Sequence, residues 1–350
     1  DIPCGRPIHA HQALEGGQVV VHDLACVIQA LDNAAPTFDP RNLTYWACKS
    51  PNERVRWSRM VRGGVEVERF KQMFHSCPAG LTTAQRRLYR ARIMALGGPG
   101  NGLWMNSIPD SPATTLRNAE LYQRLRSRLG LEFSGINLVP GKCYCHHQSV
   151  IDRHGVHLET CTMGGGLIAR HNYTASVLRQ AITSTGKFST KEAYIFDNTN
   201  KRTDLAVEHG GPDGVTAAVD VTITHPLVPS HVAAADHIIG SETHLAEVTK
   251  HADYDPIRGP NTEVVPFALG TLGRFGREAY NFLFFLAKEQ QQLDHTPISS
   301  FMATWLTRIG MAVQRMTAKA ALNRAGVLRH GTRGGGQDVH SQVLVGSGGG

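Results

Sequence analysis

The sequence contains no long hydrophobic run. No apolar stretch approaches the roughly 20 residues that a helix needs to cross a bilayer, and Asn281–Ala287 is short enough to be the buried face of a helix. A charged leader followed by a long apolar core is also missing, so we expect an intracellular protein that is neither secreted nor bound to a membrane. The chain begins without Met and ends in a glycine-rich stretch, which favours a fragment with a flexible tail over residues 331–350.

Acidic residues are fewer than basic ones. Asp and Glu number 29 against 36 Lys and Arg, which gives a formal net charge of +7, and no acid occurs from Trp305 to Arg333. The basic residues form four clusters: Arg54, Arg56, Arg59 and Arg62; Arg86, Arg87, Arg90 and Arg92; Arg117, Arg124, Arg126 and Arg128; and Arg308, Arg315, Lys319, Arg324, Arg329 and Arg333. Together they favour a polyanionic partner, DNA first and RNA as an alternative, because Lys and Arg bind phosphates regardless of base sequence. For any single cluster, the solvated face of a helix is the simpler interpretation.

Length and composition indicate a globular protein of more than one unit. With 350 residues, of which 41% are hydrophobic, the chain can bury a substantial core. The run Gly97–Gly102 breaks secondary structure and marks a boundary; it lacks the Gly-Lys-Ser/Thr ending of a phosphate loop, so a turn is the simpler interpretation. We expect an α+β protein with a helical region over 1–97, a linker with a Cys/His segment over 98–162, and a mixed domain over 163–330.

The seven cysteines are unevenly distributed. Cys4, Cys26, Cys48 and Cys77 are scattered singly and are expected to be reduced. The other three form the pattern C-x-C-x11-H-x3-C with one histidine: Cys143, Cys145, His157 and Cys161. Three thiolates and one imidazole are a complete tetrahedral set for structural Zn²⁺, which predicts a zinc knuckle over about residues 137–162. The alternative ligands are His146, His147 and His154.

Two aspartates lie in otherwise apolar, β-rich runs. Asp204 and Asp220 are sixteen positions apart, and the intervening Gly210–Gly214 segment favours a hairpin between the two runs. A carboxylate in a half-buried strand is unfavourable unless it is paired or holds a metal ion. The pair therefore predicts a site for a divalent cation such as Mg²⁺ or Mn²⁺, with a sheet-edge position for each aspartate as the alternative.

The hydrophobic pattern gives a coarse order of elements. Helices are expected over Val20–Leu31, Thr82–Met94, Leu116–Leu131, Leu167–Ile182 and Val232–Tyr254, with two more near the C-terminal end, and strands over Glu192–Phe196, Arg202–Val207, Ala217–Thr224 and Val264–Gly270. From residue 167 onward the order is helix, three strands, helix, strand. This is the order of a restriction-endonuclease-like core.

Several short motifs share their order with a known family. They are Gly98–Trp104, Arg128–Leu131, the Cys143/Cys145/His157/Cys161 group, Arg170–Asn172, Arg202–Leu205, Val219–Thr222, Lys250–Tyr254 and Pro266–Gly273. In this order they resemble the C-terminal region of non-LTR retrotransposon proteins that carry a restriction-enzyme-like endonuclease, and related reverse-transcriptase-derived proteins. The resemblance covers about two thirds of the chain, from Gly97 to Arg329.

The resemblance implies a PD-(D/E)xK-type nuclease that nicks target DNA with Mg²⁺ or Mn²⁺. Asp204 and Asp220 would ligate the metal ion, with the Val221 carbonyl as a further ligand. Lys250 would supply the lysine that is missing after Asp220. Glu192 is implied as an additional catalytic or metal residue, and the DNA-binding residues would be Arg170, His171 and Arg202. Nuclear localisation follows from the resemblance alone.

The chain departs from the family in ways that leave an alternative open. The family's Lys-x-x-Lys-Tyr is Lys250–Tyr254 with Asp253 at the second basic position, and Thr203 replaces the proline before the first aspartate. No polymerase signature such as Tyr-x-Asp-Asp occurs, so a reverse transcriptase domain would be a partner absent from this chain. The alternative function is an inactive, zinc-stabilised nucleic-acid-binding remnant. A His-Asn-His nuclease built on His146, His147 and His171 is a further alternative.

Overall fold

The computed structural model describes residues 80–109, 111–196 and 199–330. The chain divides into two compact units, Asp1–Thr82 and Thr83–Gly350, and the fold described below belongs to the second. The predicted helix Val20–Leu31, the first arginine cluster, the four scattered cysteines and the tail from residue 331 lie outside the described residues.

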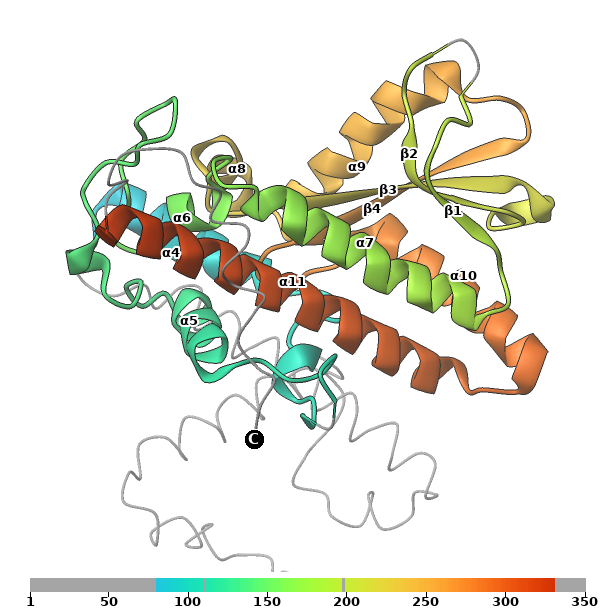
Figure 1. The fold of residues 1–350 in the computed structure, drawn as a ribbon, viewed down its shortest axis with the longest axis horizontal. Coiled ribbons are helices and arrows are strands. Elements are labelled where there is room, and N and C mark those ends of the chain that lie inside the picture. Colours follow the sequence, from blue (N-terminus) through green and yellow to red (C-terminus); the bar gives the residue numbers. More distant parts are fainter. Residues whose placement is uncertain (1–79, 110, 197–198, 331–350) are drawn as a thin grey trace, which may run out of the picture. The chain divides into compact units, whose positions relative to one another are not determined.

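Helices and one β-sheet make up the second unit, which is therefore α+β (Figure 1). The helices are α4 (Thr83–Ala95), α5 (Asn118–Leu129), α6 (Val156–Thr160), α7 (Gly166–Ser184), α8 (Pro229–Ala235), α9 (Ser241–Tyr254), α10 (Arg277–Asp294) and α11 (Ile298–His330). The strands are β1 (Ser189–Ala193), β2 (Thr203–Val207), β3 (Thr216–Thr224) and β4 (Thr262–Gly270). None of the helices in the described part of the chain is both long and apolar enough to cross a membrane.

The sheet has the order β1-β2-β3-β4 and is mixed. β1 pairs with β2 and β2 with β3 in antiparallel fashion, whereas β3 and β4 are parallel. The predicted hairpin between the two aspartate-bearing strands is thus confirmed. Its ladder ends at Leu205 opposite Val219, and one step further along the same register Asp204 lies opposite Asp220.

Alternate residues of the strands face two different layers of helices. Leu205, Val219 and Phe267 pack into the main core with residues of α7, α10 and α11. On the other face Ala218 and Val264 pack with Phe196 and Tyr254, the last residue of α9. Figure 1 shows α9 on one side of the sheet and the other three helices on the opposite side. Asp220 follows the alternation of Ala218 and therefore faces α9.

Residues 83–162 belong to the same compact unit as the sheet, so the segment 98–162 is not a linker. α5 and α6 pack against α11, and α4 packs against α8 through Leu88, Ala91 and Ala235. The boundary expected at Gly97 therefore moves to Thr82/Thr83. The Gly97–Gly102 run is a packed turn, because a Cβ atom at Gly98 would lie 2.5 Å from the guanidinium of Arg274.

Two predicted elements need correction. The single helix expected over Val232–Tyr254 is two helices, α8 and α9, which are separated by residues 236–240, the last of which is Gly240. This glycine has a φ of 76°, a left-handed conformation that an interior helical residue cannot adopt. The first strand begins at Ser189 and ends at Ala193, so it lies earlier in the chain than predicted.

Candidate metal and carboxylate sites

The four residues predicted to bind zinc converge. The ligand atoms of Cys143, Cys145, His157 and Cys161, here called the Cys3His group, all lie within 4.8 Å of one another. The Cys143 and Cys161 Sγ atoms are 3.7 Å apart, and the Cys145 Sγ and His157 Nε2 atoms are also 3.7 Å apart. Two thiolates on a tetrahedral zinc ion are separated by about 3.8 Å, given Zn–S bonds of about 2.3 Å. The group could hold a metal ion such as zinc.

Local hydrogen bonds fix the ligands of the Cys3His group in place. The Asp152 carboxylate accepts the backbone N–H groups of Val156 and His157 at the start of α6, which orients His157. A hydrogen bond from the Ser149 backbone lowers the pKa of the Cys145 thiol to about 7, which favours the thiolate needed for metal binding. The alternative ligands His146, His147 and His154 do not belong to this group.

A buried arginine lies beside the Cys3His group, where it would offset the negative charge of metal-bound thiolates. Arg324 of α11 donates from Nη2 to the Cys143 Sγ at 2.8 Å, and only 7% of the arginine is exposed. Three thiolates, a neutral imidazole and a divalent ion would carry a net charge of −1, which the guanidinium offsets. The sequence offered no signal for this contact, since the two residues are 181 positions apart.

A buried ionic network joins α6 to the core. Glu159 lies between the ligands His157 and Cys161, and its Oε1 accepts from Arg124 Nη1 at 2.6 Å. Its Oε2 lies 3.2 Å from His225 Nε2, and the opposite ring nitrogen of His225 accepts the Leu227 N–H. Burial alone would raise the pKa of Glu159, but the attraction of Arg124 and the hydrogen bond from His225 lower it to about 2. Burial lowers the pKa of His225, so this ring is neutral.

The two aspartates lie side by side at the point where β2 and β3 separate. Asp204 Oδ2 accepts the backbone N–H of Val221 at 2.7 Å and lies 2.9 Å from His171 Nε2. Asp204 Oδ1 has no hydrogen-bond partner among the described residues, and about a fifth of this side chain (22%) is exposed. The carboxylate therefore keeps one oxygen for a ligand from outside the chain.

Both oxygens of the buried Asp220 have a partner from α9. Lys250 Nζ lies 2.9 Å from Asp220 Oδ1, and the Tyr254 hydroxyl donates to Oδ2 at 2.7 Å. Lys250 and Tyr254 are four positions apart, so one face of α9 presents both. The Phe196 ring stacks on Tyr254 at 4.9 Å between centroids, which holds the hydroxyl in position. Together, Asp204, Asp220, Lys250 and Tyr254 are called the carboxylate site below.

The pKa shifts in the carboxylate site follow from these contacts. The hydrogen bond to Asp204 raises the pKa of His171 to about 9, so this side chain is an imidazolium at neutral pH. Burial and the neighbouring Asp220 raise the pKa of Tyr254, which therefore remains a hydrogen-bond donor. His171 was expected to bind DNA; its nearest ionic partner here is Asp204.

Three other predicted site residues lie elsewhere. Arg170 is buried, with 4% exposed, and donates to the Glu159 carbonyl, so the prediction that it binds DNA is wrong: its guanidinium has no access to a phosphate. Glu192 is exposed and pairs with Arg202 at 2.7 Å, and no hydrogen bond or ion pair among the described residues joins it to either aspartate. Arg202 keeps an exposed position suited to phosphate binding.

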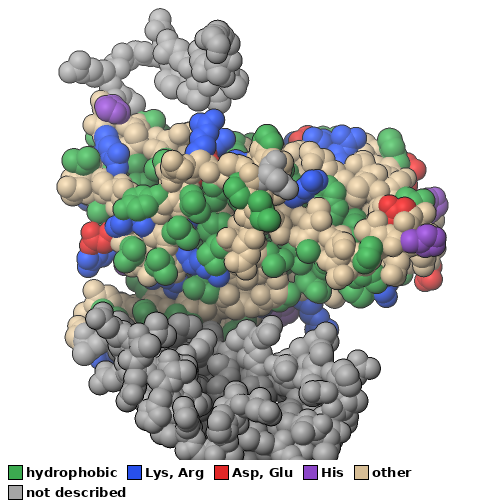
Figure 2. Space-filling view, turned by 90° about the horizontal axis from the view of Figure 1, so that it is seen from below, with side chains coloured by type: hydrophobic (Ala, Val, Ile, Leu, Met, Phe, Trp, Pro, Cys, Tyr) green, Lys and Arg blue, Asp and Glu red, His purple; other side chains and the backbone are tan. Residues whose placement is uncertain are grey.

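Many arginines of the basic clusters are used inside the fold. Arg124 and Arg324 are buried, while Arg315 donates to the Tyr173 hydroxyl and Arg329 to the Ser134 carbonyl. Figure 2 shows Lys and Arg side chains scattered over one face of the molecule among hydrophobic ones rather than gathered into a single patch. The number of arginines in the four clusters therefore exceeds the number whose side chains are accessible to a polyanionic partner.

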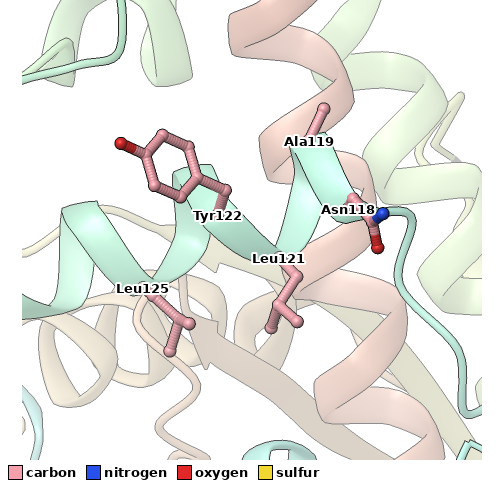
Figure 3. Close-up of a pocket in the computed structure, with 5 residues that line it drawn as sticks. All are labelled: Asn118, Ala119, Leu121, Tyr122 and Leu125. Atoms are coloured by element: carbon pink, nitrogen blue, oxygen red, sulfur yellow. The ribbon is translucent and has the colours of Figure 1, made fainter.

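The hollow in Figure 3 does not belong to either site. It has a volume of about 540 Å³ and lies along the outer face of α5. Its lining consists of Asn118, Ala119, Leu121, Tyr122 and Leu125. No acid, base or metal ligand lines it, so it offers no groups for hydrolytic chemistry.

Comparisons with known proteins leave the family open. A scan against protein-family models finds no match. A search of curated proteins finds no relative. The function must therefore be argued from the two sites themselves.

Proposed function

We propose that this protein is a metal-dependent DNA endonuclease related to the restriction-like endonucleases of non-LTR retrotransposons. The single observation that supports this most is the contact between Lys250 and Asp220, at 2.9 Å. A PD-(D/E)xK-type site needs two acids and a lysine, and here the lysine comes from a helix rather than from the strand that carries the second acid. On this proposal the sheet with α7 and α9 forms a restriction-endonuclease-like core.

Asp204 and Asp220 would hold Mg²⁺ or Mn²⁺. The donor set fits, because Asp204 retains a carboxylate oxygen without a protein partner and oxygen ligands are those that these ions prefer. When bound, the ion supplies Lewis-acid stabilisation and a more acidic water molecule. Lys250 orients the attacking water and offsets negative charge on the reacting phosphate, while Tyr254 holds the Asp220 carboxylate in place.

The Cys3His group would hold a structural zinc ion in this proposal. Its four protein ligands leave no position for a reacting water molecule. Arg202 would contact a phosphate near the cut. The proposed partners are DNA, with RNA as an alternative, and a reverse transcriptase domain that this chain lacks; the proposed location is the nucleus.

One observation favours the second candidate, an inactive nucleic-acid-binding remnant. Asp253 stands where the related endonucleases have a basic residue, and it lies 3.9 Å from Lys201. Lys201 also donates to the Asp253 backbone carbonyl at 2.9 Å, so the chain itself engages this cation. In this reading Lys250 and Tyr254 simply neutralise a buried aspartate, and the Cys3His group stabilises the fold.

Nicking of supercoiled plasmid distinguishes the two candidates. We expect the wild-type chain to nick in the presence of Mg²⁺ or Mn²⁺, and Asp204→Ala and Lys250→Ala to lose about 100-fold or more in rate. Omitting the added ion, rather than adding a chelator, keeps the zinc in place. If all three proteins bind DNA equally and none nicks it, the remnant is the better description. Lys201→Ala serves as a control for loss of a nearby positive charge.

A further inference from the structure

Most cations around the sheet are already paired with an acid. Ion pairs at distances from 2.7 to 3.9 Å join Lys187 to Glu289, Lys201 to Asp253, Arg202 to Glu192, Lys250 to Asp220 and Arg258 to Asp255. Arg179 of α7 and Lys191 of β1 are different, because neither has a carboxylate partner among the described residues. Because no described carboxylate engages them, both cations are available to an anionic ligand from outside the chain.

These two cations line the same hollow. It has a volume of about 380 Å³ between α7 and β1, and its lining consists of Ser176, Arg179, Gln180, Thr183 and Lys191. No acid lines it. The Ser176 and Thr183 hydroxyls donate to carbonyls of their own helix, so the donors facing the hollow are the two cations and the Gln180 amide. A hollow with two positive charges and no negative one suits an oxyanion.

The guanidinium of Arg179 is held in place before any ligand arrives. Its Nε donates to the Oγ of the buried Ser189 and its Nη2 donates to the Ser189 carbonyl, each at 3.3 Å. Its Nη1 has no hydrogen-bond partner among the described residues. An arginine fixed on one side and open on the other loses little conformational entropy when it binds a phosphate.

The position of the hollow relative to the carboxylate site identifies the oxyanion. Helix α7 carries His171, which contacts Asp204, and also Arg179. These two residues are eight positions apart, which corresponds to about 12 Å along the helix axis. Lys191 lies opposite Leu205, the residue that follows Asp204. Resting on the proposed nuclease function, we propose that this hollow binds a backbone phosphate of the substrate DNA about three nucleotides from the cut. The hollow therefore helps to place the strand across the carboxylate site without touching the reacting atoms.

The test is the salt dependence of DNA binding by the full-length, zinc-loaded protein. Affinity for a short duplex is measured over a series of salt concentrations without added Mg²⁺ or Mn²⁺, so that binding is separated from cleavage. For the Arg179→Ala/Lys191→Ala variant we expect weaker binding and a log–log salt slope reduced by about one, because the hollow neutralises a single phosphate and about 0.9 counterion is released for each phosphate neutralised. Lys191→Glu should weaken binding further, and Arg179→Lys should retain most of it.

Lys288→Ala is the matched control, since Lys288 is an exposed cation of α10 that lies over the Phe284 ring and does not line the hollow. Its slope should equal that of the wild type. Arg179 also contacts Ser189, so the exposed Lys191 provides the variant least affected by folding. An unchanged slope and affinity in stably folded Lys191→Ala and Lys191→Glu would overturn the proposal, even if the protein nicks DNA. If the variants reduce the salt slope but the wild-type protein never nicks DNA, the proposed phosphate site is supported and the proposed nuclease function is refuted.

Discussion

At the scale of single residues, Asp220 shows how a buried charge is made tolerable. A buried carboxylate without partners is strongly unfavourable. Here Lys250 and Tyr254 each satisfy one of its oxygens. The two donors differ in kind: the lysine brings a compensating charge, and the tyrosine brings only a hydrogen bond from a ring that Phe196 holds in place. Their removal should therefore have different consequences.

We predict that Tyr254→Phe lowers the free energy of unfolding by about 2 kcal/mol, because one hydrogen bond to a charged group is lost. Metal-dependent nicking should fall about tenfold, less than in Lys250→Ala, since the lysine remains. Urea unfolding and plasmid nicking measure the two effects. Tyr194→Phe, at an exposed tyrosine, is the control. An unchanged stability in Tyr254→Phe would contradict the contact with Asp220.

The residues of the sites were unequally predictable from the sequence. The convergence of the Cys3His group follows from its spacing, because a C-x-C and an H-x3-C pair need only one loop closure to meet. The pairing of Lys250 with Asp220 was implied by resemblance and not by spacing. Arg170 and Arg324 were misjudged or missed, because a sequence shows that an arginine is charged but not that it is buried.

At the scale of secondary structure, α11 joins the Cys3His segment to the main core. Its first half packs in the main core through Phe301, Trp305 and Ile309. Its second half packs through Ala321, Ala325 and Leu328 against Cys143, Cys161 and other residues of the Cys3His segment. The Cys3His segment therefore has no core of its own. Its stability and that of the sheet depend on the same helix.

We therefore predict that Cys161→Ser lowers the thermal midpoint of the unit by about 10 °C, equivalent to about 3 kcal/mol, in a single transition. The far-ultraviolet circular dichroism signal of the helices and the near-ultraviolet signal of the packed aromatic side chains should be lost over the same temperature range. His146→Ala, next to the group but not part of it, should melt like the wild type. Two separate transitions would show that the Cys3His segment folds independently of the sheet.

The presence of helices and strands was easier to predict than the residues at which they begin and end. The hairpin β2–β3 was found because Gly and Pro separate two β-rich runs. The break between α8 and α9 was missed because apolar residues occur on both sides of it. α8 ends at Ala235, and Gly240, with its left-handed φ, directly precedes α9. The packing of α4 on α8 depends on tertiary contacts, which periodicity does not encode.

At the scale of the whole molecule, net charge is a poor measure of available charge. The chain carries +7, yet Arg124, Arg170 and Arg324 are buried and serve carboxylates, carbonyls or a thiolate. Their positive charges stabilise the fold rather than attract a partner. The network around Arg124 in particular makes the stability of the protein sensitive to pH.

We predict that stability falls on acidification in two stages. His225 stays neutral in the fold, whereas in the unfolded chain it takes up a proton below about pH 6.5. Glu159 stays ionised in the fold down to about 2, whereas in the unfolded chain it is protonated below about 4.5. In both ranges the unfolded state binds more protons, so stability is present at higher pH and is lost as the pH falls.

The difference between wild type and His225→Gln isolates the upper stage. Other histidines and the metal ligands titrate equally in both proteins and cancel. The thermal midpoint of the wild type should fall more steeply than that of the variant as the pH is lowered below about 6.5. Parallel curves would mean that His225 does not supply the pH dependence.

The outer strand β1 has a consequence for behaviour at high concentration. A strand at the edge of a sheet offers unpaired backbone groups on which a second molecule can add its own strand, the first step toward fibrous aggregates. β1 has only five residues, its Lys191 and Glu192 are exposed, and Glu192 has a φ of 48°, which interrupts the extended backbone. The edge that β1 offers to a strand of another molecule is therefore short, charged and bent, which disfavours pairing. The features that arrange β1 beside the carboxylate site thus also keep separate copies of the protein from joining their sheets through this strand.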